Sequence, residues 1–226
     1  MVMSDMRRVD AVVFDVVETL FGLDAVARAL TSLGQAGSTL DVFFTRMLRD
    51  AFALGCTNRY RPFAEFADSS LAVAAPTLDD AQRGAVLSAF GELTAHSDVQ
   101  PAFERLRSEG VRIAALTNGS ATNTARLLDR NDLASFVEVV ISVDEIQVWK
   151  PHPAPYQHAL TRLDLPGDRV AMVAVHAWDT HGARAAGLVT GWASRLEGVY
   201  AAVFDPPDVQ GADLVEVVDG LIAPTA

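Results

Sequence analysis

Short hydrophobic runs recur along the chain, separated by turn residues and by segments with helical spacing. The runs are rich in Val, Ile, Leu and Ala and do not alternate with polar residues, which is typical of strands buried on both faces of a parallel sheet. We therefore predict strands at Ala11–Phe14, Val111–Leu116, Val137–Ser142, Val170–Val175 and Leu188–Ala193, with a weaker one at Leu214–Val218. Strands that alternate with helical segments indicate an α/β fold with a Rossmann-like parallel sheet.

The pattern changes after the predicted first strand. No strand-like run follows for about 75 residues, which is far longer than an ordinary connection between strands. The hydrophobic positions there have helical spacing, as in Asp41–Leu54 and Leu78–Leu93. We expect a helical cap subdomain inserted after the first strand, with a core of residues 1–21 and 97–226 and a cap of residues 22–96.

Composition and charge narrow the choice of partners. The 226 residues include 18 Lys and Arg against 29 Asp and Glu, a net charge of −11. A surface this acidic repels nucleic-acid phosphates and anionic lipids, so we expect neither nucleic acid nor a membrane as partner. A small anionic substrate remains possible, because a local cluster of hydrogen-bond donors can override the global field.

The lengths of the hydrophobic runs and the number of cysteines bear on where the protein is located. No hydrophobic run approaches the roughly 18 residues that a membrane span needs, and Asp15 interrupts the first run too early for a signal peptide. The single cysteine, Cys56, excludes a disulfide within the chain and fits a reducing compartment. It has no basic neighbour in sequence to activate it as a nucleophile. We expect a soluble, cytoplasmic protein.

Polar motifs follow four of the predicted strands. In a parallel α/β sheet the ligand crevice lies outside the carboxyl ends of the strands, so these motifs are expected to converge. In chain order they are Asp15-Val16-Val17-Glu18-Thr19, Thr117-Asn118-Gly119-Ser120, Trp149-Lys150-Pro151 and His176-Ala177-Trp178-Asp179.

These motifs, in this order and with a helical insertion after the first, resemble the haloacid dehalogenase superfamily of hydrolases. Within it the sequence is most similar to the type II L-2-haloacid dehalogenases, over nearly the whole chain. Leu20-Phe21 after the first motif and Tyr156, six residues after Lys150, add to the resemblance. It implies that Asp15 attacks a substrate carbon and forms an ester, which water then hydrolyses at the Asp15 carbonyl.

The chemistry of the residues agrees with that mechanism. A carboxylate at a strand end and helix start faces backbone N–H groups, which keep it ionised and nucleophilic. Lys150 supplies positive charge, Thr19 and Thr117 can donate hydrogen bonds, and Asp179 can fix Lys150 or help to activate water. The alternative for Asp15 is a simple helix N-cap.

The resemblance also implies which residues surround the substrate. Tyr156 stands at the spacing from the lysine that the dehalogenases use, although a packed helix aromatic would fit the same position. We expect the substrate to contact Val16, Thr117, Asn118, Tyr156, His176 and Phe44.

The residue two positions after Asp15 bears on the reaction class. Phosphatases of the superfamily have a second Asp there to protonate an alkoxide, but this chain has Val17. Halide leaves without a proton, so Val17 favours carbon–halide chemistry. The fourth motif offers one carboxylate, Asp179, which disfavours magnesium; we expect no metal and no cofactor. A metal set of His176, Asp179 and His181 is a weaker alternative.

The sequence departs from the dehalogenase pattern in several places. Phe44 stands where the family has an arginine that receives the halide, and Arg46 would point about 200° away on a helix. Ala174 and His176 replace a serine and an asparagine of the family, and Glu18 stands where many relatives have glycine. His176 can be a base, a donor to a substrate carboxylate, or a histidine bonded to backbone.

Three functional hypotheses remain open. The first is a metal-independent hydrolase that acts on a small 2-substituted carboxylic acid through an aspartyl ester, with halide or another activated group leaving. The second is a magnesium-dependent phosphatase that works without the second Asp. The third is a dehalogenase-like binding protein without turnover, in which Phe43 and Phe44 fill a closed cap. The resemblance also implies a homodimer.

Overall fold

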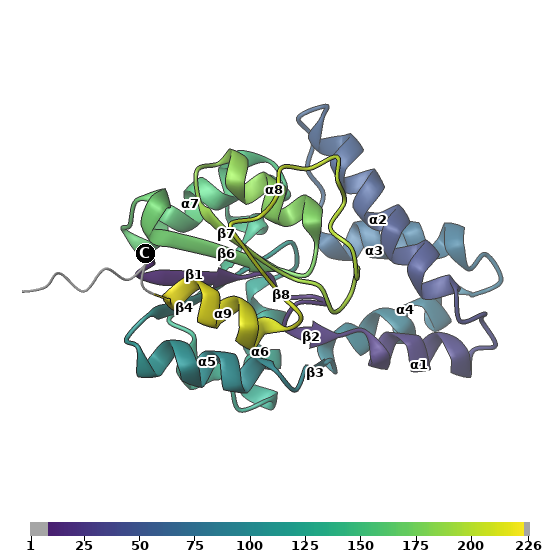
Figure 1. The fold of residues 1–226 in the computed structure, drawn as a ribbon. Helices are drawn as coiled ribbons and strands as arrows, with labels where there is room; N and C mark the ends of the chain where they lie inside the picture. The colour runs from purple at the N-terminus through teal and green to yellow at the C-terminus, as the bar shows by residue number, and fades with distance from the viewer. Residues whose placement is uncertain (1–8, 224–226) are drawn as a thin grey trace, which may run out of the picture.

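A parallel sheet forms the centre of the computed structural model, which describes residues 9–223 (Figure 1). Its six strands lie in the order β5-β4-β1-β6-β7-β8, and every neighbouring pair is parallel. The strands are β1 (Ala11–Phe14), β4 (Arg112–Thr117), β5 (Val139–Ser142), β6 (Val170–Ala174), β7 (Val189–Ala193) and β8 (Val209–Gly211). The first five predicted strands and the α/β fold class are therefore confirmed.

The prediction of a sixth strand at Leu214–Val218 is wrong, because this segment belongs to helix α9 (Leu214–Ile222). The Asp213 side chain caps the helix by accepting a hydrogen bond from Glu216 N, 2.9 Å away. A short apolar run fits a buried helix as well as a buried strand. Here every third or fourth residue is buried, namely Leu214, Val217, Val218 and Leu221.

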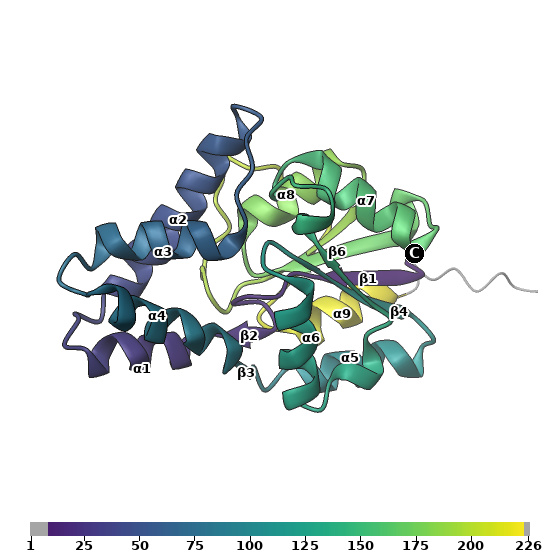
Figure 2. The same ribbon diagram turned by 180° about the vertical axis from the view of Figure 1, so that it is seen from behind.

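Helices cover both faces of the sheet (Figures 1 and 2). Successive residues of a strand point to opposite faces. Accordingly Phe14 packs with α5, α6 and α9, and Val13 packs with α7 and α8. These helices are α5 (Val99–Ser108), α6 (Ala121–Arg130), α7 (Pro153–Leu163) and α8 (Ala177–Ala185). Short 3₁₀ turns occur at Ala89–Gly91, Ala134–Phe136, Val143–Glu145 and Gly167–Arg169.

Residues 24–91 form a group of helices beside the sheet, which we call the helical insert (Figure 2). Its helices are α1 (Asp24–Ser32), α2 (Thr39–Gly55), α3 (Phe63–Ala74) and α4 (Asp80–Ser88). Two antiparallel strands of two residues each, β2 (Phe21–Gly22) and β3 (Thr94–Ala95), lie at its base. They were not predicted, since two residues carry no periodicity. The exact division between core and cap stays a prediction.

The helical insert is tied to the core near the carboxyl ends of the strands. The Tyr60 hydroxyl donates to the Asp144 carboxylate, and Trp149 Nε1 donates to Arg61 O at 3.0 Å. The Trp149 ring also packs edge-on against Phe66, with ring centres 5.1 Å apart. The end of the sheet that carries the polar motifs is therefore the end that the insert covers.

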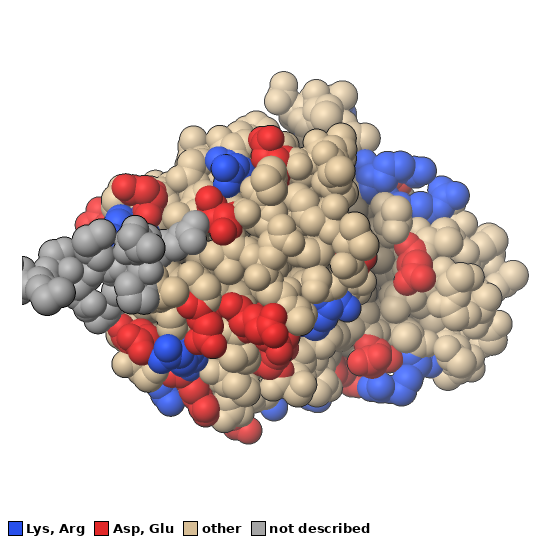
Figure 3. All heavy atoms as spheres, in the orientation of Figure 1, with Lys and Arg blue, Asp and Glu red and all other residues tan. Residues whose placement is uncertain are grey.

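Charged side chains of both signs are spread over the face of the molecule seen in Figure 3, with basic groups gathered over the insert beside α2. Within residues 9–223, no helix is both long and apolar enough to cross a membrane.

Candidate active site

Asp15 lies at the carboxyl end of β1, and only 6% of its surface is exposed. Its Oδ1 accepts a hydrogen bond from Lys150 Nζ at 2.8 Å, and its Oδ2 accepts one from Thr19 Oγ1 at 2.6 Å. We expected a helix to start here, which is wrong: the chain turns tightly, with the N–H groups of Leu20 and Phe21 bonded to Val16 O, and enters β2. Side-chain donors, not a helix N-terminus, therefore hold the Asp15 carboxylate.

Lys150 is the only lysine in the sequence, and its side chain is completely buried. Its ammonium group donates to Asp15 Oδ1 at 2.8 Å, to Asp179 Oδ2 at 2.7 Å and to Leu116 O at 3.1 Å. Burial alone would lower the pKa of Lys150, but the two carboxylates raise it above its usual value. All three ammonium protons have acceptors, so Lys150 serves as a fixed positive charge between two carboxylates.

The two carboxylates differ in their electrostatic surroundings. Burial acts to raise the pKa of Asp15, but Lys150 and His176 outweigh it and hold this pKa well below its usual range. Burial raises the pKa of Asp179, and the Asp15 charge adds to that effect although Lys150 opposes it. Asp15 is thus the carboxylate kept ionised, as a nucleophile must be.

Tyr156 lies at the same site and is fully buried. Its hydroxyl donates to Asp179 Oδ1 at 2.6 Å, so both oxygens of Asp179 are occupied, one by Tyr156 and one by Lys150. Burial raises the pKa of Tyr156 well above its usual value, which keeps the hydroxyl protonated as a donor. Tyr156 therefore positions Asp179 in addition to packing in the core.

The turn after β4 supplies two more of the predicted residues. The Asn118 side-chain oxygen accepts a hydrogen bond from Lys150 N at 2.9 Å, which fixes the backbone that carries the lysine. The Thr117 hydroxyl accepts a hydrogen bond from Gly119 N at 2.9 Å, leaving its own proton for another acceptor. Thr117 and Asn118 both line the cavity at Asp15, whereas Val16 lines an adjacent one.

His176 lies at the carboxyl end of β6, directly before α8, and is 7% exposed. Its Nε2 donates to Glu18 Oε2 at 3.0 Å, and its Nδ1 lies 3.5 Å from Asp15 Oδ2. Burial acts to lower the pKa of His176, but the neighbouring carboxylates of Asp15 and Glu18 raise it to about 10. The ring faces two carboxylates, so the interpretation of His176 as bonded to backbone is wrong.

The backbone of Glu18 has the left-handed conformation that glycine would favour, and contacts with distant segments hold it there. Its φ of 68° lies in the left-handed region, which a residue with a side chain adopts only when its surroundings hold it there. The Glu18 carbonyl accepts hydrogen bonds from His96 Nε2 at 3.1 Å and from Arg195 Nη2 at 3.2 Å. This clamp directs the Glu18 carboxylate at His176. The only sequence signal for the pair was that both positions depart from the family pattern.

The cavity beside Asp15 is small, about 20 Å³, which is room for about one water molecule. Phe44 of α2 forms part of its wall, together with His176. The remaining wall is mostly apolar and includes Val17, Met47, Leu48, Phe63, Trp149 and Trp178.

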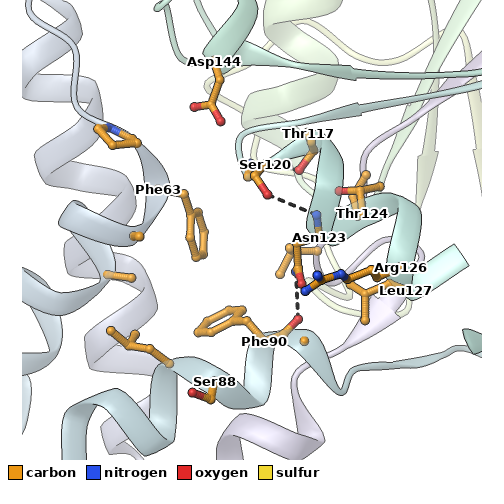
Figure 4. Close-up of a pocket in the computed structure, with 18 residues that line it drawn as sticks. Phe63, Ser88, Phe90, Thr117, Ser120, Asn123, Thr124, Arg126, Leu127 and Asp144 are labelled. Carbon is orange, nitrogen blue, oxygen red and sulfur yellow. Dashed lines mark hydrogen bonds between the residues drawn. The ribbon is translucent and has the colours of Figure 1, made fainter. Parts of the chain in front are cut away.

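Two larger cavities adjoin the small one. A cavity of about 420 Å³ lies between the insert and α6, where Phe63 and Phe90 face Asn123 and Arg126 (Figure 4). Asn123 Nδ2 donates to Phe90 O at 3.0 Å across it. The other, of about 580 Å³, runs along α2 and shares Phe44, His176 and Trp178 with the small cavity.

The alternative metal set does not assemble. Asp179 faces Lys150 and Tyr156, while His181 stacks on Phe204 with ring centres 5.0 Å apart. Over residues 9–223, no three or more His, Cys, Asp or Glu side chains are placed to share a metal ion. The hypothesis that His176, Asp179 and His181 bind a metal together is wrong.

Comparisons with known proteins place this site in a family. The model of the haloacid dehalogenase-like hydrolases matches residues 9–187. The chain is 26% identical to (S)-2-haloacid dehalogenase H-109 of Pseudomonas putida, over 96% of this chain and 100% of that protein. It is 30% identical to (S)-2-haloacid dehalogenase 4A of Burkholderia cepacia, over 93% and 91%.

A solved structure supports the same assignment. A dehalogenase crystallised as an intermediate complex superimposes with a TM-score of 0.88 at 27% identity, over 96% of this chain and 99% of that one. The family match covers most of the chain, and the ordered strand ends that it includes carry Asp15, Lys150 and Asp179. The chain therefore belongs to the haloacid dehalogenase-like hydrolase family.

Proposed function

We propose that the protein is a metal-independent hydrolase that removes a leaving group from carbon 2 of a small carboxylic acid through an ester of Asp15. The observation that carries this proposal is the buried ion-pair network in which Lys150 bonds Asp15 at 2.8 Å and Asp179 at 2.7 Å. The similarity to (S)-2-haloacid dehalogenases over more than 90% of the chain supports halide as a leaving group.

The reaction has two steps. An oxygen of the Asp15 carboxylate forms a bond to carbon 2 of the substrate while the carbon–halogen bond breaks and its electron pair leaves with halide. Water then adds to the Asp15 carbonyl carbon, and the ester bond breaks to release a 2-hydroxy acid and a proton. Lys150 stays protonated in both steps and stabilises negative charge on the Asp15 oxygens.

The surrounding side chains fit a small carboxylate. Thr117 and Asn118 provide hydrogen-bond donors beside Asp15, and Val16 lines the adjacent larger cavity. Tyr156 lines neither cavity; it lies behind Asp179, to which its hydroxyl donates. Val17 lines the cavity where a phosphatase of the superfamily has its acid. An apolar residue there cannot protonate an alkoxide, which favours the dehalogenase reaction over phosphate-ester hydrolysis.

We also propose that the helical insert acts as a cap. With only about 20 Å³ beside Asp15, a substrate of several heavy atoms enters after Phe44 and its neighbours move. The Tyr60–Asp144 and Trp149–Arg61 hydrogen bonds are the contacts that close the insert onto the core.

Halide release from (S)-2-chloropropionate and chloroacetate, without added metal, tests the proposal. The wild type releases halide and the Asp15→Asn variant does not. In a single turnover in H₂¹⁸O, mass spectrometry then finds one ¹⁸O atom in the peptide that contains Asp15, because water attacks the enzyme carbonyl. Halide release that persists in Asp15→Asn, or label found only in the product, contradicts an Asp15 ester.

The closed cavity favours one other candidate, a binding protein without turnover. Phe43 is fully buried and Phe44 is 9% exposed, so both fill the insert above Asp15. This candidate predicts that small carboxylates raise the melting temperature of the wild type while no ester forms on Asp15. Ester formation with any 2-substituted acid eliminates it.

We further propose a cytoplasmic homodimer, on the resemblance to the dehalogenases and on the single cysteine. Light scattering of the purified chain and fractionation of the source cells test these two points. A monomer at micromolar concentration contradicts the first, and recovery with membranes or secreted protein contradicts the second.

A further inference from the structure

His176 and Glu18 form a pair that the two-step reaction above leaves unused. Among residues 9–223, His176 Nδ1 has no hydrogen-bond partner, although the side chain is more than nine-tenths buried. This nitrogen lies 3.5 Å from Asp15 Oδ2, in the wall of the cavity at the nucleophile. A buried polar atom without a partner costs free energy, and it is tolerated here at the point where the reaction takes place.

The bond to Glu18 determines what Nδ1 can do. Because a carboxylate only accepts, the 3.0 Å contact requires the proton on Nε2 of His176. When the ring is neutral, Nδ1 therefore carries the lone pair and faces Asp15; when the ring is charged, Nδ1 carries a proton in the same direction. Glu18, clamped by His96 and Arg195, thus selects the tautomer.

We propose that His176, positioned by Glu18, is an acid–base residue that protonates the leaving group in the first step and deprotonates water in the second. The inference rests on the proposed Asp15 ester, and it extends the substrate class to 2-substituted acids whose leaving group is an oxygen or nitrogen atom. Such groups need a proton to depart, whereas halide does not.

The proton balance of this cycle closes without any further reagent. In the first step Asp15 bonds to carbon 2, the bond to the leaving group breaks, and the Nδ1 proton of the imidazolium goes to that group. In the second step the neutral Nδ1 takes a proton from water as the hydroxide adds to the Asp15 carbonyl carbon. The ester bond then breaks, and the proton of the added hydroxyl goes to the departing alkoxide. When the leaving group is halide, which takes no proton, the Nδ1 proton is released to solvent before the second step. The released 2-hydroxy acid and the carboxylate leave His176 charged again.

The charges around His176 agree with this order of events. In the resting enzyme the carboxylates of Asp15 and Glu18 stabilise the imidazolium, whose pKa is about 10. Esterification removes the Asp15 charge, so the pKa of His176 falls and the ring can act as a base. The other charged groups around this face are Lys150, 6.0 Å from the Trp178 ring, and Asp41, Arg49 and Glu197 along the adjoining cavity.

The leaving-group side of the cavity supports the acid role. Phe44 stands where the dehalogenases have a halide-binding arginine, and the wall around it is formed by Met47, Leu48, Phe63 and Trp178. Lys150 has donated all three protons to fixed acceptors. His176 is therefore the cationic donor in this wall that has a proton to offer.

The variant His176→Asn separates the two roles with two substrates. With (S)-2-chloropropionate we expect a burst of one halide per Asp15 and an accumulated ester, visible by mass spectrometry, with turnover reduced about 10²- to 10⁴-fold. With oxirane-2-carboxylate, whose ring oxygen needs a proton, we expect ring opening by the wild type and no ester in the variant. His158→Asn is the matched control, since His158 bonds Glu145 at the same 3.0 Å outside the site.

Glu18→Gln tests the positioning role and guards against a folding defect in the first variant. Removing the Glu18 charge lowers the pKa of His176, so the pH profile of ester hydrolysis shifts to lower pH while the halide burst persists. Turnover of chloropropionate by His176→Asn at the wild-type rate, or failure of the wild type to open the oxirane, overturns the inference. Absence of an ester in the wild type and all variants overturns the proposed function as well.

Discussion

The polar side chains on the two sides of Asp15 differ in how completely they are hydrogen-bonded. On one side Lys150 bonds Asp15 and Asp179 within 2.8 Å, and Tyr156 completes a fully buried network. On the other side His176 stands 3.5 Å from Asp15 and is held by Glu18, whose backbone adopts a φ of 68°. The first side has every polar atom satisfied, whereas the second keeps one nitrogen free. The difference separates groups that hold charge in place from a group able to move a proton.

The largest effect is expected from Lys150→Met, which removes the centre of the satisfied side. Two buried carboxylates are then left without their cation, so we expect activity to fall by about 10³-fold or more and the free energy of unfolding to fall by about 3–5 kcal/mol. Halide release and urea unfolding measure the two effects. Arg162→Met removes an exposed partner of Glu145 and serves as the control. Stability unchanged by Lys150→Met would show that the network does not hold the fold.

A smaller effect is expected from Tyr156→Phe, which removes one donor from the same network. Asp179 Oδ1 loses its 2.6 Å hydrogen bond in a fully buried position, so we expect a loss of about 1–3 kcal/mol of stability. Turnover should fall by roughly tenfold, since Asp179 then holds Lys150 less firmly. Tyr200→Phe, at a half-buried tyrosine that donates to Asp205 O, is the control. Equal losses in both variants would mean that Tyr156 contributes packing alone.

From the protonation of His176 we predict that the free energy of unfolding depends on pH. The pKa of His176 is about 10 in the folded state and 6.5 in an unfolded chain, so its protonation stabilises the fold. That stabilisation is complete below pH 6.5 and is lost as the pH rises through 10. We expect the difference in unfolding free energy between wild type and His176→Asn to shrink over this interval. A constant difference in urea titrations between pH 6.5 and 10 would show that the ring is neutral.

The sequence predicted the residues on the Lys150 side of Asp15 better than those on the His176 side. The meeting of Asp15, Thr19, Lys150 and Asp179 was predictable, because strand ends of a parallel sheet converge. The roles expected for these residues came from the resemblance to the dehalogenases. The Glu18–His176 contact was not, since it depends on a left-handed residue and on a carbonyl clamp from distant segments. The sequence showed that Glu18 and His176 both depart from the family pattern. The fold was needed to show that their side chains are in contact.

The fold shows the same division between regular and irregular features. Continuous Val and Ala runs identified β1, β4, β5, β6 and β7, because strands buried on both faces leave that pattern. The run at Leu214–Val218 became a helix, since an Asp213 cap and burial on one face outweigh β propensity. The two-residue strands β2 and β3 depend on chain closure at the base of the insert and leave no signal of their own.

The smallest predicted effect concerns the closure of the insert over both sides. Tyr60→Phe removes the hydrogen bond to Asp144 and leaves the Trp149–Arg61 bond in place. The bond is exposed, so we expect at most about 1 kcal/mol of lost stability. The open state becomes more populated, and we expect KM to rise roughly two- to fivefold. The insert contributes apolar side chains to the cavity at Asp15, namely Phe44, Met47, Leu48 and Phe63, so we expect the halide burst per Asp15 to stay at one equivalent. Stopped-flow quenching of tryptophan fluorescence by substrate measures the closing rate, since Trp149 and Trp178 both line the cavity at Asp15. An unchanged rate in Tyr60→Phe would place the closing contact at the Trp149–Arg61 bond instead.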